Sequence, residues 1–168
     1  MKHTTTKKLV LASLMAALSM GLYALESLVP PIVPIPGVKL GLANVITLIC
    51  LYVIGAKLSF AVLSVRIALS SLLFGSPMSL LFSISGGVLS FVVMLVLKKY
   101  ISHENIWALS VFGAFGHNLG QVAMAVVVTS QLSVAYYFLF LIISSVVTGV
   151  FTGICAQTAV KKYKSINF

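Results

Sequence analysis

The chain has 168 residues, of which 60% are hydrophobic and only 8% are charged. So few charges cannot cover the surface of a soluble domain, and the composition therefore indicates an integral membrane protein. Helical spans of roughly 17–25 residues would use nearly the whole length if there were six of them. This leaves no room for a soluble catalytic domain, and we expect a single all-α membrane domain over residues 1–168.

The net charge of +9 comes from basic residues at the ends of apolar runs. The lysines in such positions are Lys2, Lys7, Lys8, Lys57, Lys98, Lys99, Lys161, Lys162 and Lys164. This placement is typical of a signal for membrane orientation and not of a stripe that binds nucleic acid, so no nucleic-acid partner is predicted. Cys50 and Cys155 lie singly in apolar runs without metal-ligand spacing, which predicts no metal site.

Six apolar segments follow one another along the chain, separated by short breaks rich in Pro, Gly and polar residues. The predicted spans are residues 8–29, 38–54, 58–75, 78–97, 107–129 and 135–160. The first segment could be a cleaved signal peptide, but it runs on to Leu28 without a clean small-x-small site, which favours a first span. The apolar, proline-rich break after it, PPIVPIPG, is either a stiff connection or a lid over a site.

The basic residues predict the orientation of these six spans. They lie at the N-terminus, in the second and fourth breaks and at the C-terminus, whereas the other breaks contain only Lys39, at a span boundary. Cytoplasmic loops of membrane proteins carry the excess of Lys and Arg. We therefore expect a six-helix bundle with both termini in the cytoplasm, an N-in/C-in topology.

The fifth span contains the most polar stretch, SVFGAFGHNLGQ. At about 100° per residue, its small and polar side chains share one side and its large apolar ones the other: Ser110, Gly113, Gly116, His117, Gly120 and Gln121 against Phe112, Phe115, Leu119 and Val122. Gly116 and Gly120 form a GxxxG, which permits close helix approach. An intramembrane ionisable residue such as His117 is a candidate for function. Hydrogen bonding to neighbouring helices is the alternative.

Arg66 lies near the middle of the third span. A buried arginine keeps its charge, so it needs a carboxylate, a carbonyl or an anionic ligand. Glu26, the only acid in any span, is the natural protein partner, and both a Glu26–Arg66 pair and a ligand clamp remain open. Lys39 and Asn44 could reach the same outer-half cavity, although Lys39 could equally snorkel to the interface.

Small residues form stripes on two other spans. Ser79, Ser83, Gly86 and Ser90 lie along the fourth span, where a packing seam is expected. In the first span, Ser13, Ala17 and Gly21 lie opposite Glu26. That face could receive a helix of this bundle or of a partner.

Several catalytic motifs are absent from the sequence. It has no GxxxxGK[ST], GxSxG or HExxH and no aspartate, so neither ATP hydrolysis nor an aspartate-rich magnesium–diphosphate site is possible in this chain alone. We therefore expect a protein that is not an enzyme and that has no cofactor.

Three stretches, ALESLVPPIVPIPGVKLGLANVITLICLYVIG, SVFGAFGHNLGQ and FSISGG, resemble a bacterial membrane family known as the Gx transporter family and as heptaprenyl diphosphate synthase component I. The resemblance covers almost the whole chain and implies a multi-pass protein of the bacterial plasma membrane. The family is similar to the S-components of energy-coupling-factor transporters. Those six-helix proteins capture a vitamin-like solute and rely on a transmembrane coupling subunit and two ATPases.

The resemblance also implies a site and a docking surface. Carried over by position, the substrate-binding residues would be Glu26, Lys39, Asn44, Arg66, His117, Asn118 and Gln121. S-components often dock their partner through an AxxxA in the first helix. Ala12 and Ala16 have that spacing here, and the face of Ser13, Ala17 and Gly21 is the rival.

The sequence therefore predicts a solute-binding subunit, embedded in membrane lipid, that captures a small organic molecule, anionic or amphipathic, from outside. Arg66 and Lys39 would neutralise its charge, and the polar residues of the fifth span would orient it. The alternative is a non-catalytic membrane subunit associated with heptaprenyl diphosphate and menaquinone synthesis, or with flavin–quinone electron export. A third possibility is an assembly anchor without a ligand.

Overall fold

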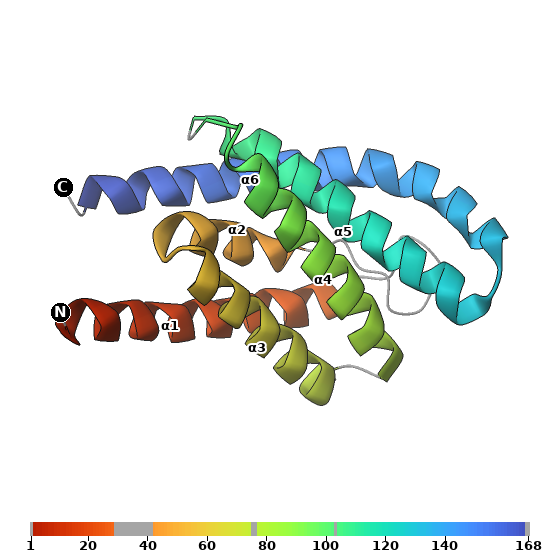
Figure 1. Ribbon diagram of the computed structural model, residues 1–168, viewed down its shortest axis with the longest axis horizontal. Helices are drawn as coiled ribbons and strands as arrows, with labels where there is room; N and C mark the ends of the chain where they lie inside the picture. Colours follow the sequence, from red (N-terminus) through yellow and green to blue (C-terminus); the bar gives the residue numbers. More distant parts are fainter. Residues whose placement is uncertain (1, 29–41, 75–76, 103, 167–168) are drawn as a thin grey trace.

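The computed structural model describes residues 2–28, 42–74, 77–102 and 104–166 (Figure 1). Within those ranges the chain is helical and has no strand. The helices are α1 (Lys2–Ser27), α2 (Asn44–Val53), α3 (Ala56–Phe74), α4 (Pro77–Leu97), α5 (Ile106–Thr129), the 3-10 helix η1 (Leu132–Tyr137) and α6 (Phe138–Ile166). Five of them, α1 and α3 to α6, are long and apolar enough to cross a membrane. The predicted all-α membrane class is confirmed.

The second predicted span, residues 38–54, differs from the helix that the structure describes. Helix α2 has only 10 residues, and at 1.5 Å per residue it is about 15 Å long, roughly half the hydrocarbon thickness of a bilayer. Residues 38–41 lie outside the described residues. At its other end α2 ends at Val53, and Gly55 terminates it two residues later. The φ of Gly55, 89°, lies in the left-handed region, and its N–H donates to the Cys50 carbonyl.

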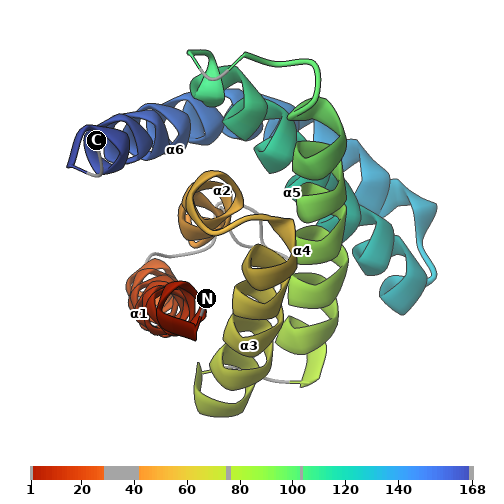
Figure 2. The ribbon, with the colours of Figure 1, turned by 60° about the vertical axis from the view of Figure 1, so that its left-hand side comes forward.

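Helix α2 is the centre of the bundle. It contacts each of the five long helices, which surround it in Figure 2. Helix α5 packs along both α4 and α6, whereas α1 packs mainly on α2 and α3. Because α2 begins partway through the bundle, its N-terminus lies among side chains of its neighbours.

Both chain ends lie at the same end of the bundle (Figure 1), as the N-in/C-in prediction requires. Which side of the membrane that end faces stays a prediction. Lys98, just after α4, donates a hydrogen bond from Nζ to the Leu51 carbonyl at 2.6 Å, and its Nζ lies 4.6 Å from the Tyr52 ring centroid. Partial burial, and then the nearby Lys164, lower the pKa of Lys98. The contact satisfies a carbonyl in the last turn of α2, where no helical partner exists.

Glycines allow α5 to pack backbone to backbone on both sides. A β-carbon at Gly120 would lie 2.5 Å from the Ser85 carbonyl oxygen of α4, which confirms the close approach that the GxxxG predicts. On the other side, β-carbons at Gly149 and Gly153 of α6 would lie 2.6 and 2.5 Å from Cα of Val111 and Trp107. This second GxxxG was missed in the sequence, although its spacing is the same.

The burial of α5 follows the predicted two faces, with one error. The predicted small and polar residues are buried, and Phe112, Phe115 and Leu119 are exposed, as expected for a lipid-facing side. Val122 was predicted on the lipid side, but only 5% of it is exposed. That prediction was wrong because α6 covers a second side of α5, where Val122 packs in a cluster with Leu141.

Candidate functional site

Arg66 is buried in the middle of α3, with 3% of its surface exposed. Its Nη2 donates a hydrogen bond to Asn44 Oδ1 at 3.3 Å, at the first residue of α2. Its Nε has no hydrogen-bond partner among the residues that the structure describes. The guanidinium also interacts electrostatically with Glu26 and Tyr23 of α1. Two helices, α1 and α2, thus bring polar groups to the buried cation of α3.

Glu26 connects α1 to the start of α2. Only 5% of the residue is exposed, and its Oε2 accepts a hydrogen bond from the Leu42 N–H at 3.1 Å. Ser19, on the same face of α1, donates from Oγ to the Ala43 carbonyl at 3.3 Å. Glu26 is close enough to Arg66 to interact electrostatically with it, and Glu26 also fixes the backbone before α2.

Tyr23 was not among the predicted site residues. It is 2% exposed, and its hydroxyl shares a hydrogen bond with Ser79 Oγ of α4 at 3.0 Å. Tyr23 lies three residues before Glu26 and four after Ser19, so helical spacing places all three on one face. That polar spacing was a signal available in the sequence.

His117 and Gln121 pack against Gly86 in α4. A β-carbon at Gly86 would lie 2.9 Å from His117 Nδ1 and 2.9 Å from Gln121 Cγ, so both side chains rest on the Gly86 backbone. A β-carbon at the next residue, Gly87, would lie 3.7 Å from Arg66 Nη2. His117 and Arg66 are close enough to interact electrostatically. The two glycines of FSISGG therefore make room for predicted site residues of two neighbouring helices. Gly86 makes room for His117 and Gln121 of α5, and Gly87 makes room for Arg66 of α3.

Asn118 points elsewhere. It is 1% exposed, and its Nδ2 donates to the Leu141 carbonyl at 3.1 Å and to Ser145 Oγ at 2.8 Å, both in α6. The structure thus brings His117 towards Arg66 and places Gln121 beside His117 at Gly86, whereas Asn118 binds α6. Lys39, the remaining predicted site residue, lies outside the described residues.

The two candidate docking faces of α1 differ in exposure. Ala12 is 8% exposed and Ala16 is half-buried, because both pack inward against α2 and α3. Ser13, Ala17 and Gly21 are exposed, and a β-carbon at Gly21 would have nothing within 4 Å. In this structure only the second face is available to a partner helix.

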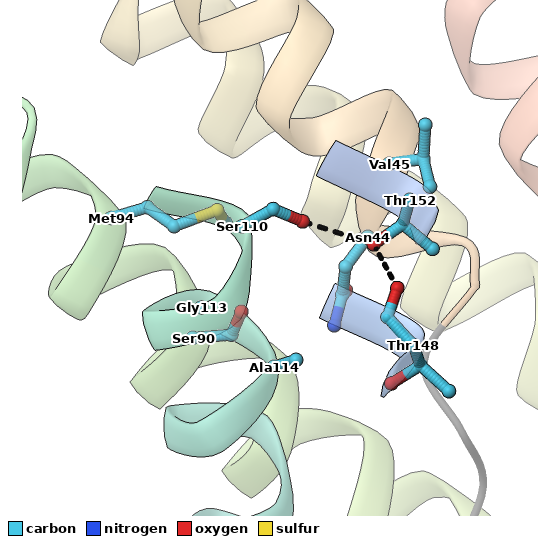
Figure 3. A pocket seen from close by; sticks show the side chains of 9 residues that line it. All are labelled: Asn44, Val45, Ser90, Met94, Ser110, Gly113, Ala114, Thr148 and Thr152. Carbon is cyan, nitrogen blue, oxygen red and sulfur yellow. Dashed lines mark hydrogen bonds between the residues drawn. The ribbon is translucent and has the colours of Figure 1, made fainter. Parts of the chain in front are cut away.

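A small polar cavity lies beside Asn44, between α2, α4, α5 and α6 (Figure 3). Its volume is about 10 Å³, which suits about one water molecule. It is lined by Asn44, Val45, Ser90, Met94, Ser110, Gly113, Ala114, Thr148 and Thr152. An apolar groove of about 620 Å³ also lies along η1, and none of the predicted site residues lines it. The cavity has room for one water molecule but not for an organic solute in this conformation.

The comparisons with known proteins identify a family. The heptaprenyl diphosphate synthase component I family matches residues 15–159, which is most of the chain. No curated protein and no solved structure matches this chain. The chain therefore belongs to the heptaprenyl diphosphate synthase component I family.

Proposed function

We propose that this chain is a membrane solute-binding subunit that captures a small organic solute, anionic or amphipathic, at a group of buried polar residues. This group, the Arg66 cluster, consists of Arg66, Asn44, Glu26, Tyr23 and His117. In this proposal it works as the S-components of energy-coupling-factor transporters do, with a transmembrane coupling subunit and ATPase subunits. The chain itself carries out no catalysis.

The observation that carries the proposal is the state of Arg66. The guanidinium is buried, one of its nitrogens bonds to a neutral amide at 3.3 Å, and Nε has no partner within the described ranges. A charged group in hydrocarbon is costly unless its donors are satisfied. An acidic group of a solute would satisfy Nε and strengthen the charge pairing.

The position of α2 supports the same chemistry. Its first residue, Asn44, lies beside Arg66. A helix N-terminus carries partial positive charge, and in transporters interrupted helices direct such ends at anionic substrates. Glu26 offsets part of the charge of Arg66, so Arg66 can be buried in the membrane both before and after a solute binds.

We propose that capture involves a movement of helix α1 away from Arg66. The cavity that the described residues form next to Asn44 has a volume of about 10 Å³, which is too small for a solute. Helix α1 packs mainly on α2 and α3, with a hydrogen bond between Tyr23 and Ser79 of α4, whereas α4, α5 and α6 are joined through their glycines. In this proposal α1 shifts, while α2 keeps its contacts with α4, α5 and α6 and the last three helices hold His117 and Gln121 in place to orient the solute.

A second candidate function is favoured by the family name. The words "synthase component I" denote one component of an enzyme made of several. In this alternative the chain is a non-catalytic membrane subunit associated with heptaprenyl diphosphate and menaquinone synthesis, and the partner supplies the acidic catalytic motifs. The same cluster would then bind the charged end of a lipid-tailed molecule. Flavin–quinone electron export is a further context for such a subunit.

Purification from native membranes in mild detergent separates the two candidates. The transporter proposal predicts that a transmembrane coupling subunit and ATPases are recovered with the chain. Recovery of a prenyl diphosphate synthase without ATPases would contradict that proposal and support the second candidate.

A further inference from the structure

The side-chain amide of Asn44 lies between Arg66 and the small cavity. Its Oδ1 accepts the hydrogen bond from Arg66, whereas its Nδ2 has no partner among the described residues and lines the small cavity of Figure 3. An amide donor that stays unpaired in a protein interior is costly. The cavity is therefore missing a hydrogen-bond acceptor.

Ser90 is the second unsatisfied group at the same cavity. It is 1% exposed, and its Oγ has no hydrogen-bond partner in the described part of the chain. In Figure 3 its hydroxyl and the Asn44 amide point towards one another across the cavity. A single oxygen atom between them would accept from Asn44 and exchange a hydrogen bond with Ser90.

The other residues that line the cavity indicate whether that oxygen is charged or neutral. The hydroxyls of Ser110 and Thr152 share a hydrogen bond of 2.9 Å, and Thr148 donates to the Ser144 carbonyl at 2.7 Å. None of the residues that line the cavity is charged. The lining therefore suits a neutral oxygen, and the volume of about 10 Å³ admits only one or two heavy atoms.

We propose that this cavity is a neutral-oxygen subsite of the Arg66 cluster. One water molecule occupies it in the unliganded protein, and a hydroxyl or carbonyl oxygen of the bound solute replaces that water. The inference rests on the proposed function, and it narrows the substrate class. Because Asn44 contacts both places, the solute carries an acidic group with an uncharged oxygen a few bonds away, as in a hydroxy acid or an oxo acid.

Two short acids that differ by one hydroxyl test the subsite. The thermal unfolding midpoint of the purified full chain is measured while lactate or propionate is titrated. We expect lactate to reach half of its effect at about a five-fold lower concentration, as one neutral hydrogen bond predicts. Ser90→Ala should remove this preference, and Ser90→Cys, a weaker donor of similar size, should reduce it if the alanine variant does not fold. Ser85→Ala, on α4 but outside the cavity, should keep it.

The result of the titration separates the subsite from the Arg66 site. Equal effects of lactate and propionate, both lost in Arg66→Gln, would overturn the subsite and leave the acid site standing. A lactate preference that persists in Ser90→Ala would overturn the role of Ser90. If neither acid shifts the midpoint of the wild type, the acid site of the proposed function fails, and the subsite fails with it.

Discussion

Helices α4, α5 and α6 are held together differently from helices α1, α2 and α3. In the first group glycines let backbones touch, as where Gly120 faces the Ser85 carbonyl and Gly153 faces Trp107. In the second group buried polar side chains make key connections, with Glu26 bonded near the start of α2 and Arg66 bonded to Asn44. The two groups meet at Gly86 and Gly87 of α4.

The difference follows from the membrane as a solvent. Lipid tails are as apolar as leucine, so helices associate through close packing or through interhelical hydrogen bonds. Close packing cannot be replaced by a ligand, because it needs the matching backbone. A hydrogen bond to a polar side chain can be exchanged for a hydrogen bond to a solute. The polar half is therefore the half in which a ligand can compete.

The largest expected effect in the polar half comes from Glu26→Gln. It leaves the buried Arg66 without the opposing carboxylate, which we expect to lower the free energy of unfolding by about 3–5 kcal/mol. Glu26→Gln combined with Arg66→Gln should be less destabilised than Glu26→Gln alone. Glu104, the other acid in the sequence, is exposed, and Glu104→Gln is the matched control. The free energy of unfolding of each variant is measured by denaturant titration in detergent. Equal values for Glu26→Gln and Glu104→Gln would contradict the electrostatic interaction between Glu26 and Arg66.

The close-packed half should be sensitive to a single methyl group. Gly120→Ala places a β-carbon against the Ser85 carbonyl, and we expect a loss of about 2–3 kcal/mol from this overpacking. The control is Gly21→Ala, because the β-carbon there would meet nothing within 4 Å. If both variants unfold at the same temperature as the wild type, α4 and α5 are not in backbone contact.

Neighbouring residues of α5 should separate stability from binding. Asn118→Ala removes the hydrogen bonds to α6, and we expect it to cost about 1–2 kcal/mol of stability while solute binding is kept. His117→Leu should fold and lose binding. Thermal unfolding and solute content are measured for both variants. A His117→Leu protein that does not fold would assign His117 to packing instead.

The smallest effect is expected at Lys98. Lys98→Met removes the bond to the Leu51 carbonyl and the contact with the Tyr52 ring, which we expect to lower stability by about 0.5–1 kcal/mol. Lys99 is exposed, so Lys99→Met should change nothing. If the two variants have the same unfolding midpoint, the end of α2 does not depend on Lys98.

The sequence predicts the helices and their buried faces well, because apolar length and the helical period are local properties. The polar face of α5 and the burial of Arg66 could both be expected from spacing alone. Which neighbouring helix each of those side chains contacts could not be predicted from spacing. Periodicity does not say that Asn118 meets α6 while His117 meets α4, or that α6 also covers Val122.

The start of α2 was harder to predict for a related reason. The sequence GLANVITLICLYV is apolar on both sides of Asn44, so hydropathy does not mark a helix that begins inside the bundle. The capture of the preceding backbone by Glu26 and Ser19 of α1 is a long-range contact. It becomes visible only when the two helices are placed side by side.

The central claim is that the Arg66 cluster holds an acidic small molecule. The most direct measurement is mass spectrometry of the small molecules extracted from the wild type, Arg66→Gln and Asn118→Ala, each purified from native membranes in mild detergent. We predict an acidic compound in near-stoichiometric amount in the wild type and Asn118→Ala, and its loss from folded Arg66→Gln. The same compound at the same level in folded Arg66→Gln would contradict the account.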